Sequence, residues 1–412
     1  MQENNISPNN FENCLKCNIC AQVCPMMEAN PHYPGPKQAG PDGERYRLKD
    51  PAFFDLTLKY CLNCKRCEVA CPSGVKVGDI IQMARLRYGR KSNLLRDFAL
   101  ASTDLVGSVA TTVAPIVNGT LKLKPVKKVM SLMGVDEHRT FPEYSARRFE
   151  TWFRNSSPSQ SGFSRFVSYF HGCYVNYNYP QLGMDFVTLL NACGYGVRLL
   201  EDEKCCGVAL ISNGFGKAAE RNARVNVASV REALKSSEAV LTSGSTCTFT
   251  IRDEYDHLLG CDTSDIRSGF QLATKWIYDK VESGQVRLAF KPEWKASAAY
   301  HTACHINKLG WGIYSISLLR MIPGMDLTVL DQECCGIAGT FGFKKENYEY
   351  SQKIGSRLFS LIEKAGPQFV ATDCETCKWQ IEMSAGIPVK NPISILVEAL
   401  DIEQTTLLNN GR

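Results

Sequence analysis

The sequence lacks the segments that would carry a protein into or across a membrane. Its first residues, MQENNISPNNFEN, contain neither the basic region nor the apolar stretch of a signal peptide. No run of about 18 uncharged apolar residues follows anywhere in the chain. We therefore expect a cytoplasmic protein, in which the 19 cysteines are kept reduced and are unsuited to structural disulfides.

Motifs for nucleotide cofactors are lacking as well. Neither G-x-G-x-x-G nor G-x-x-x-x-G-K-[ST] occurs, so nothing predicts a site for flavin, NAD or ATP. The excess of 47 basic over 42 acidic residues is too small to indicate nucleic-acid binding. Without flavin or NAD we do not expect this chain to take a hydride from an organic substrate, and we expect it to receive electrons from a partner.

The chain is rich in regularly spaced cysteines. The first eight form two runs with the same spacing. The pattern C-x2-C-x2-C-x3-C-P occurs twice, and in such a run three thiolates hold one [4Fe-4S] cubane while the fourth holds its neighbour. A zinc site, with its two pairs of ligands, fits this spacing poorly. The predicted ligands are Cys14, Cys17, Cys20 and Cys71 for the first cluster and Cys61, Cys64, Cys67 and Cys24 for the second.

The long proline- and glycine-rich insert between these runs, PGPKQAGPDGERYRLKD, resembles that of the α-helical ferredoxin domain more than the small β-rich one. We assign this domain to residues 1–90 and a basic amphipathic linker region to residues 91–164. The basic side chains at the end of the first domain and in the linker could face an anionic membrane surface, a partner subunit, or solvent on a helix packed against a domain. They are Arg85, Arg87, Arg90, Lys91, Arg96, Lys122, Lys124, Lys127 and Lys128.

From about residue 165 the chain contains two copies of one domain, which we place at residues 165–290 and 291–405. FVSYFHGC, EDEKCCG and AVLTSGSTC in the first copy correspond to ASAAYHTAC, LDQECCG and FVATDCETC in the second. Short β-branched runs alternate with helical patterns, which predicts α/β units with parallel strands. The cysteines then lie at strand ends, where an open α/β sheet gathers ligands in one crevice.

The second copy has five cysteines in this pattern, one more than the four irons of a cubane need. They are Cys304, Cys334, Cys335, Cys374 and Cys377. Two adjacent cysteines cannot readily bridge each other, but on a turn kept open by Gly336 their thiolates can reach different irons. The arrangement resembles the CCG domain of heterodisulfide reductase B-type subunits, and this resemblance implies a non-cubane [4Fe-4S] cluster.

The first copy departs from the pattern, because Gly244 stands where the second copy has Cys374. A cubane, a zinc ion and the absence of any metal all stay open for this site. Its remaining cysteines are Cys173, Cys205, Cys206 and Cys247. Two further cysteines, Cys193 and Cys261, have no counterparts and are interpreted as ordinary buried thiols.

Histidines and lysines near these cysteines have two interpretations each. His171, His301 and His305 either make structural contacts around the clusters or carry protons. Lys344 and Lys345 either offset the negative charge of a thiolate-bound cluster or are surface residues at a helix start. No catalytic residue is assigned.

The sequence around and between the cysteine motifs shows a further resemblance. FENCLKCNICAQVCP, KYCLNCKRCEVACPS, SYFHGCYVNYNYPQLG and CCGIAGTFGFKKENY with TDCETCKWQIEMS are similar to the iron-sulfur subunits of anaerobic glycerol-3-phosphate dehydrogenases. The resemblance implies a flavin-bearing partner that oxidises sn-glycerol 3-phosphate, and a third subunit. It also implies that this chain lies peripherally on the cytoplasmic face of the inner membrane and delivers the electrons to menaquinone or ubiquinone.

Three alternatives share the same cluster motifs. One is a thiol-disulfide enzyme like heterodisulfide reductase, in which the five-thiol cluster cleaves a disulfide. The second is the iron-sulfur subunit of a glycolate or lactate oxidase complex. The third is an assembly scaffold that binds clusters or zinc without electron transfer. Whether the chain itself carries the quinone-reducing site is left open by the sequence.

Overall fold

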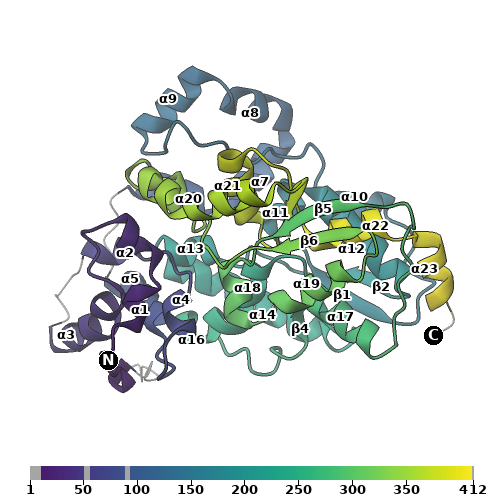
Figure 1. Cartoon of the computed structure of the whole chain (residues 1–412), viewed down its shortest axis with the longest axis horizontal. Coiled ribbons are helices and arrows are strands. Elements are labelled where there is room, and N and C mark those ends of the chain that lie inside the picture. The colour runs from purple at the N-terminus through teal and green to yellow at the C-terminus, as the bar shows by residue number, and fades with distance from the viewer. Residues whose placement is uncertain (1–10, 51–55, 89–92, 411–412) are drawn as a thin grey trace.

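The computed structural model describes residues 11–50, 56–88 and 93–410. A helical N-terminal part lies at one end of the molecule, two α/β units lie side by side at the other, and a helical segment projects from the body at the top of the view (Figure 1). Arg90 and Lys91 of the predicted basic surface fall outside the described residues. None of the helices in the described ranges is both long and apolar enough to cross a membrane.

The N-terminal part contains only helices and loops in the residues that the structure describes, as the α-helical type of ferredoxin domain predicts. Its helices are short because the cysteine loops interrupt them, and Pro25 begins one of them, where a missing N–H costs no hydrogen bond. Met26, Leu58, Ile80 and Ile81 form its core. The elements are η1 Phe11–Asn13, α1 Ile19–Gln22, α2 Pro25–Ala29, η2 Gln38–Asp42, α3 Gly43–Lys49, η3 Leu56–Tyr60, α4 Arg66–Val69 and α5 Val77–Tyr88.

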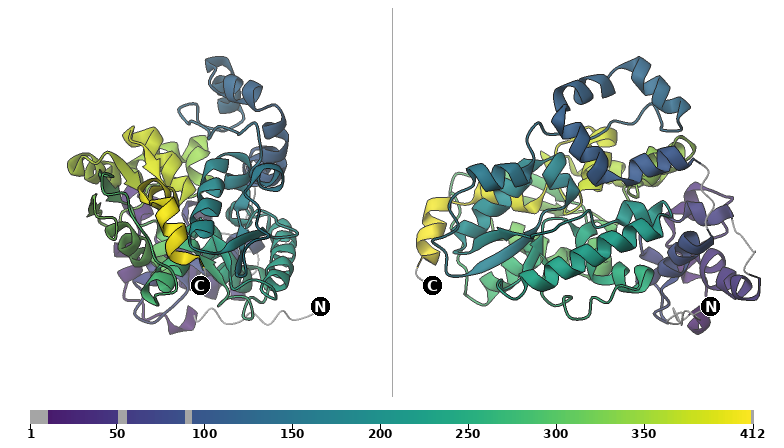
Figure 2. Two further views of the ribbon diagram at one scale, coloured as in Figure 1. Left: turned by 90° about the vertical axis from the view of Figure 1, so that its right-hand side faces the viewer. Right: turned by 180° about the vertical axis from the view of Figure 1, so that it is seen from behind.

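The predicted linker region is helical too, but only part of it projects. α8 and α9 stand out from the body in all views (Figures 1 and 2), whereas the chain that follows α9 returns into the core. There Arg139, 2% exposed, donates to the carbonyl oxygen of Gly342 and to Ser351 Oγ. The helices of the region are α6 Leu94–Ala101, α7 Thr103–Thr112, α8 Ala114–Leu121, α9 Lys124–Leu132 and α10 Phe149–Ser156.

Two of the basic side chains predicted for a membrane or partner surface face inward instead. Arg85 donates to the carbonyl oxygens of Cys61 and Ser212. Arg96 is 4% exposed and binds Glu346 through both terminal nitrogens. Arg85 therefore does not lie on the outer basic face predicted for it, and Arg96 does not lie on the exposed face of a basic helix, because each guanidinium joins separate segments of the fold.

Two four-stranded parallel sheets form the rest of the molecule, and their strand orders are the same. The first sheet has the order β2-β1-β3-β4 and the second β6-β5-β7-β8. This equality confirms the predicted duplication. The strands are β1 Phe166–Phe170, β2 Gly196–Leu199, β3 Val240–Thr242, β4 Phe270–Leu272, β5 Ala296–Tyr300, β6 Met325–Val329, β7 Phe369–Ala371 and β8 Val389–Lys390.

Helices cover the sheets and join the two copies through one core. α12 packs against α22 and α17 against α19, so that Phe186 and Trp276 of the first copy share a cluster with Tyr300 and Ile395 of the second. First-copy helices are α11 Gly172–Tyr177, α12 Pro180–Ala192, α13 Val208–Ser212, α14 Gly216–Ala233, α15 Ser245–Phe249, η4 Thr250–Glu254, α16 Tyr255–Leu259 and α17 Ala273–Glu282. Second-copy helices are α18 Cys304–Leu309, α19 Gly312–Arg320, η5 Phe341–Phe343, η6 Lys345–Asn347, α20 Tyr348–Ala365, α21 Glu375–Ala385, α22 Pro392–Ala399 and α23 Ile402–Asn409.

In each sheet the chain order reverses at the strand that begins the copy, β1 or β5. β1 pairs with β2 on one side and with β3 on the other, and β5 pairs in the same way with β6 and β7. Connections leave the carboxyl ends of two such strands in opposite directions and open a crevice between them. Both cysteine groups of the α/β units lie at these ends.

Candidate iron-sulfur sites

The two N-terminal cysteine loops have the same unusual backbone. Lys16 and Asn18 in the first loop have φ angles of 59° and 64°, and Asn63 and Lys65 in the second have 56° and 61°. A left-handed conformation costs a non-glycine residue roughly 1–2 kcal/mol. Alternating left- and right-handed residues turn successive N–H groups inward to form a concave anion site. The loops are therefore built to surround a negatively charged group such as a thiolate-bound cluster.

The eight cysteines of these loops gather in two sets of four. Cys14, Cys17, Cys20 and Cys71 line one cavity. Cys24, Cys61, Cys64 and Cys67 line another. These sets match the crossed grouping that the spacing predicts, in which each run lends its fourth cysteine to the other. That each set ligates a cluster stays a prediction.

Burial disfavours the ionised form of these thiols, so a nearby positive charge is required to keep them as thiolates. Burial and the neighbouring Cys64 together raise the pKa of Cys24 to about 12. The pKa of Cys67 is raised in the same way, by burial and by the nearby Glu68. The iron of a cluster supplies the charge that would keep such thiols ionised.

A buried lysine between two of the cysteines fixes the second loop. Lys65 is 1% exposed, and its ammonium group binds Asp79 and lies 3.3 Å from Glu254 and 3.7 Å from Glu68. Burial alone would raise the pKa of Asp79, but Lys65 and His257 hold it well below its usual range. Since Glu254 belongs to the first α/β copy, this network attaches the N-terminal part to that copy. The cysteine spacing contains no signal for it.

The five cysteines of the second α/β copy come together as the sequence predicts. Cys304 begins α18, Cys374 caps α21, and Cys335 Sγ lies 3.4 Å from Cys377 Sγ. The turn after the adjacent pair needs glycine: Gly336 has φ 85°, and a Cβ there would lie 2.0 Å from the carbonyl oxygen of Ser351. The backbone N–H of Gly336 donates to Cys334 Sγ at 3.4 Å.

A thiol of the second N-terminal set touches this five-thiol group. The Cys304 side chain lies beside those of Cys334 and Cys64, and both raise the pKa of its thiol. Arg66 lies beside the contact and donates to Glu333 Oε2 at 3.3 Å. Burial alone would lower the pKa of Arg66, but thiolates at Cys304 and Cys64 raise it. The two candidate sites are therefore neighbours with no intervening residue.

The four cysteines of the first α/β copy also form one group, in which Cys173 neighbours Cys205, Cys205 neighbours Cys206, and Cys206 neighbours Cys247. The linker contributes a side chain to it: the N–H of Cys205 donates to Asp104 Oδ2 at 2.7 Å. Burial and the Cys205 thiolate raise the pKa of Asp104 to about 7. Sequence reasoning missed Asp104 because no motif connects it with the cysteines.

The histidines differ in their surroundings. His171 lies 3.2 Å from Glu203 and 3.3 Å from Glu150. Burial opposes its charge, but the two carboxylates raise its pKa to about 9. His301 is fully buried, which lowers its pKa to about 4, and its ring nitrogens have no hydrogen-bond partner in the described part of the chain. His305 contacts the carbonyl oxygen of Asn63 at 3.2 Å and stacks on Phe249.

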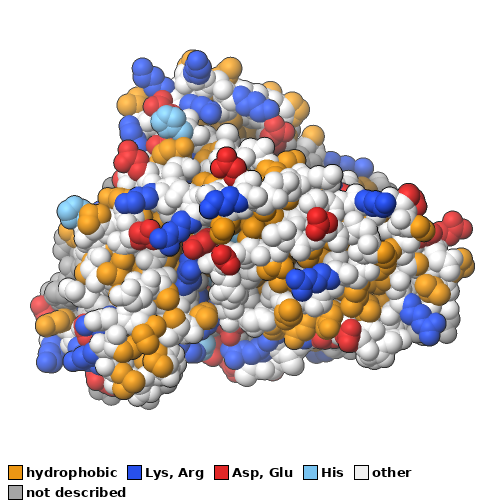
Figure 3. Space-filling view, viewed as in Figure 1, with side chains coloured by type: hydrophobic (Ala, Val, Ile, Leu, Met, Phe, Trp, Pro, Cys, Tyr) orange, Lys and Arg blue, Asp and Glu red, His pale blue; other side chains and the backbone are white. Residues whose placement is uncertain are grey.

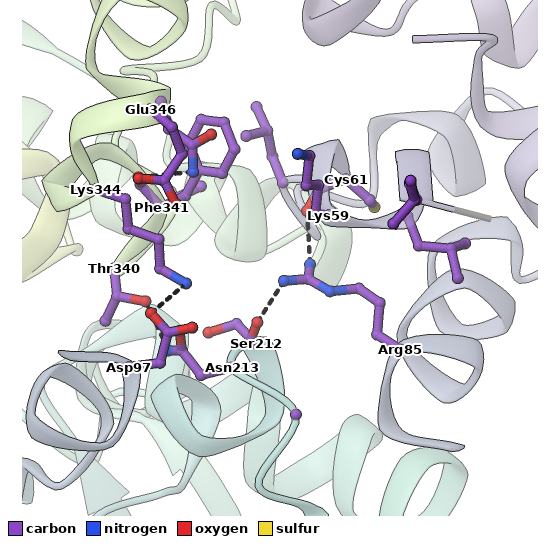
Figure 4. Close-up of a pocket in the computed structure, with 16 residues that line it drawn as sticks. Lys59, Cys61, Arg85, Asp97, Ser212, Asn213, Thr340, Phe341, Lys344 and Glu346 are labelled. Carbon is purple, nitrogen blue, oxygen red and sulfur yellow. Dashed lines mark hydrogen bonds and ion pairs between the residues drawn. The ribbon is translucent and has the colours of Figure 1, made fainter. Parts of the chain in front are cut away.

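A cavity opens where the N-terminal part, the linker and both copies meet (Figure 4). Cys61 forms one wall, and Leu58, Leu62 and Phe341 supply apolar surface. Lys344 lines the opposite side and pairs with Asp97 at 3.0 Å, while burial lowers the pKa of this lysine. Its neighbour Lys345 is exposed.

Family models of known proteins match the N-terminal part and both α/β copies. The 4Fe-4S dicluster domain matches residues 10–75, and the cysteine-rich domain (CCG) matches residues 167–252 and 298–382. Among the residues that the structure describes, no group of three or more His, Cys, Asp or Glu could hold a single metal ion. Fold and thiol groups thus define an iron-sulfur protein with a dicluster domain and two CCG domains.

Whole-chain relatives narrow this class. The chain is 53% identical over 392 residues, 95% of its length and 98% of the relative's, to the C subunit of anaerobic glycerol-3-phosphate dehydrogenase from Escherichia coli strain K12. It belongs to that family of C subunits. More distant relatives are the B subunit of fumarate reductase (CoM/CoB) from Methanothermobacter marburgensis (24% identity, 90% of this chain and 67% of that one) and a probable glycolate oxidase iron-sulfur subunit of Bacillus subtilis (24%, 90% and 88%).

Solved structures add nothing to this assignment. Glutamate racemase from Bacillus anthracis covers 60% of this chain and 82% of its own at 10% identity, with a TM-score of 0.28. That similarity is too low to support an argument about fold.

Proposed function

We propose that this chain is the electron-transfer subunit of an anaerobic sn-glycerol-3-phosphate dehydrogenase. Oxidation of the alcohol to dihydroxyacetone phosphate releases two electrons and two protons at a flavin-bearing partner, and a quinone that takes up both becomes a quinol. The observation that carries the proposal is the contact of Cys64 with Cys304, because it places two candidate cluster sites side by side. Bound iron-sulfur clusters supply one-electron carriers at such sites.

The thiol groups support a specific set of cofactors. The left-handed loops and the two sets of four cysteines fit two [4Fe-4S] cubanes, and the five thiols of the second CCG domain fit a non-cubane [4Fe-4S] cluster. For the first CCG domain we propose a further cluster rather than zinc, because no group of its described residues could hold a single metal ion. We keep the domain boundaries at residues 1–90, 91–164, 165–290 and 291–405 as part of this proposal.

The cavity in Figure 4 suits the electron acceptor. Its apolar wall of Leu58, Leu62 and Phe341 fits a quinone ring, and Lys344 offers a donor to a quinone oxygen. Cys61, a predicted cluster ligand, forms part of the same wall. A quinone bound there would lie directly beside the second N-terminal site, so this chain itself would carry the quinone-reducing site.

The projecting helices support peripheral attachment to the cytoplasmic face of the inner membrane. Ile116, Leu123, Val129 and Leu132 are 67%, 52%, 57% and 84% exposed. Lysines and apolar side chains are mixed over this projection at the top of Figure 3. Apolar side chains beside lysines bind anionic lipid surfaces. The lysines are Lys122, Lys124, Lys127 and Lys128.

Replacement of Cys335 by Ser tests the proposed function. In the anaerobically purified complex with the flavin subunit and any third subunit, quinone reduction should be lost while dye-linked oxidation of glycerol 3-phosphate continues. Cys261→Ser, which changes a thiol outside the four groups, is the matched control and should keep both activities. Quinone reduction by Cys335→Ser at the control rate would show that the five-thiol site is structural only.

Disulfide cleavage is the less favoured function. Cys334, Cys335, Cys374 and Cys377 are each 6% exposed or less, so a disulfide substrate would have little direct access to their thiols. Electron transfer needs no such access.

A further inference from the structure

The first CCG domain has a gap where the second has Cys374. Gly244 caps α15 just after β3, as Cys374 caps α21 just after β7. Their backbone angles are nearly the same, with φ −116° and ψ 123° at Gly244 and φ −134° and ψ 114° at Cys374. A side chain at position 244 would therefore point the same way in its domain as the Cys374 thiol does.

A carboxylate from the other copy takes this space. A Cβ on Gly244 would lie 2.6 Å from Oε1 and 3.0 Å from Oε2 of Glu375. Glu375 reaches the first domain because the copies meet here: Ser245 donates through its N–H and its hydroxyl to the carbonyl oxygen of Asp373, at 2.8 and 2.9 Å. The missing thiol of one copy is thus replaced in space by an acid of the other.

This carboxylate lacks the partners that other acids near the site have. Asp104 accepts from the N–H of Cys205, and Glu203 accepts from the N–H of Gly172 at 2.7 Å and pairs with His171. In the described residues, Glu375 has no ion pair and no hydrogen bond from another residue. It is only partly exposed, and its charged neighbours are acids and thiols: Asp373, Cys374 and Cys247.

We propose that Glu375 is the fifth ligand of an iron-sulfur cluster in the first CCG domain, beside Cys173, Cys205, Cys206 and Cys247. A partly buried carboxylate without a cation is costly, and a direct bond from its oxygen to one iron ion of the cluster would offset that cost. The proposal rests on the proposed function only in taking the CCG domains to hold clusters. Two adjacent residues would then serve different sites, Cys374 as a ligand in the second CCG domain and Glu375 as a ligand in the first.

Iron and sulfide content test this directly. In anaerobically purified holoprotein, Glu375→Ala should lose about four irons and four sulfides per chain. Its Mössbauer spectrum should lack one component, and the ferredoxin-type components should stay. Glu363→Gln, on the exposed surface of α20, should match the wild type. A wild-type iron count and spectrum for Glu375→Ala would overturn the proposal.

A second variant separates ligand loss from misfolding. Gly244→Cys combined with Glu375→Ala places a thiol in the space that the carboxylate leaves, and it should restore the iron count. Continued depletion in the double variant would overturn the proposal, as would loss of zinc instead of iron in Glu375→Ala. Failure of quinone reduction in the complex would contradict the proposed function alone, because these iron counts do not depend on the acceptor.

Discussion

At the scale of single residues, backbone conformation decides how the cysteines can act. The left-handed residues Lys16 and Asn18 turn the first loop around its thiols, and Asn63 and Lys65 do the same in the second. Gly336 permits two adjacent cysteines to face one site because its φ of 85° and the nearby Ser351 carbonyl oxygen exclude any side chain. Cysteine spacing alone does not provide a site unless these residues shape the chain between them.

Cys17→Ser tests the crossed assignment of the cubanes. Cys17 is exposed in a loop with Cys14 and Cys20, and its loss leaves one cluster with three thiolates. We expect about four fewer irons per chain, with the spectrum of the five-thiol cluster unchanged. Cys261→Ser again serves as the control. An unchanged iron count in Cys17→Ser would refute this ligand assignment.

At the scale of elements, one region of helices has two separate tasks. α6 and α7 serve the interior: Arg96 holds Glu346, and Asp104 reaches the first CCG site. α8 and α9 project from the body instead, where Leu132 is 84% exposed. A linker of basic and apolar composition thus divides into a half packed against the body and a half that projects from it.

Charge removal on the projecting half tests its attachment to membranes. Each lysine near an anionic leaflet contributes about 1 kcal/mol, so changing Lys122, Lys124, Lys127 and Lys128 to Gln should weaken sedimentation with anionic vesicles by about 4 kcal/mol at most. About 0.5 M salt should weaken the wild type in the same direction, because it shortens the Debye length. Iron content should not change.

The control for this experiment replaces four lysines elsewhere with Gln: Lys217, Lys235, Lys291 and Lys295. Equal sedimentation of the wild type with neutral and anionic vesicles would remove the electrostatic argument. If the α8–α9 variant binds vesicles normally but no longer captures the flavin subunit, the projection is a docking surface for that subunit.

At the scale of the whole molecule, charged side chains fix the position of the N-terminal part relative to the two α/β copies. Lys65 joins the N-terminal loop to Glu254 of the first copy, and Arg66 joins the same loop to Glu333 of the second. The neighbouring Cys64 is therefore held against Cys304 by contacts on both sides. The relative placement of the candidate clusters depends on these few interactions.

Lys65→Met tests this placement. The substitution leaves Asp79, Glu68 and Glu254 buried without their cation, and breaking such a pair costs about 3–5 kcal/mol. We expect the unfolding midpoint of the anaerobic holoprotein to fall by several degrees. Lys235→Met breaks an exposed pair with Glu232 and should cost less than about 1 kcal/mol. Equal midpoints for the two variants would contradict the role of Lys65.

The sequence by itself determined the two dicluster cysteine runs, the two α/β copies and the gathering of the cysteines at strand ends, because spacing and periodicity are local properties of the chain. The helical type of the dicluster domain and the family followed from resemblance to known proteins. Only the tertiary structure decided which residues distant in sequence lie beside the cysteine sites. Asp104, Glu254 and Glu375 reach their sites across domain contacts, and Arg85 and Arg96 turn inward although their neighbours in sequence suggest a basic surface. Such encounters depend on how separate elements pack, and no spacing within one segment encodes them.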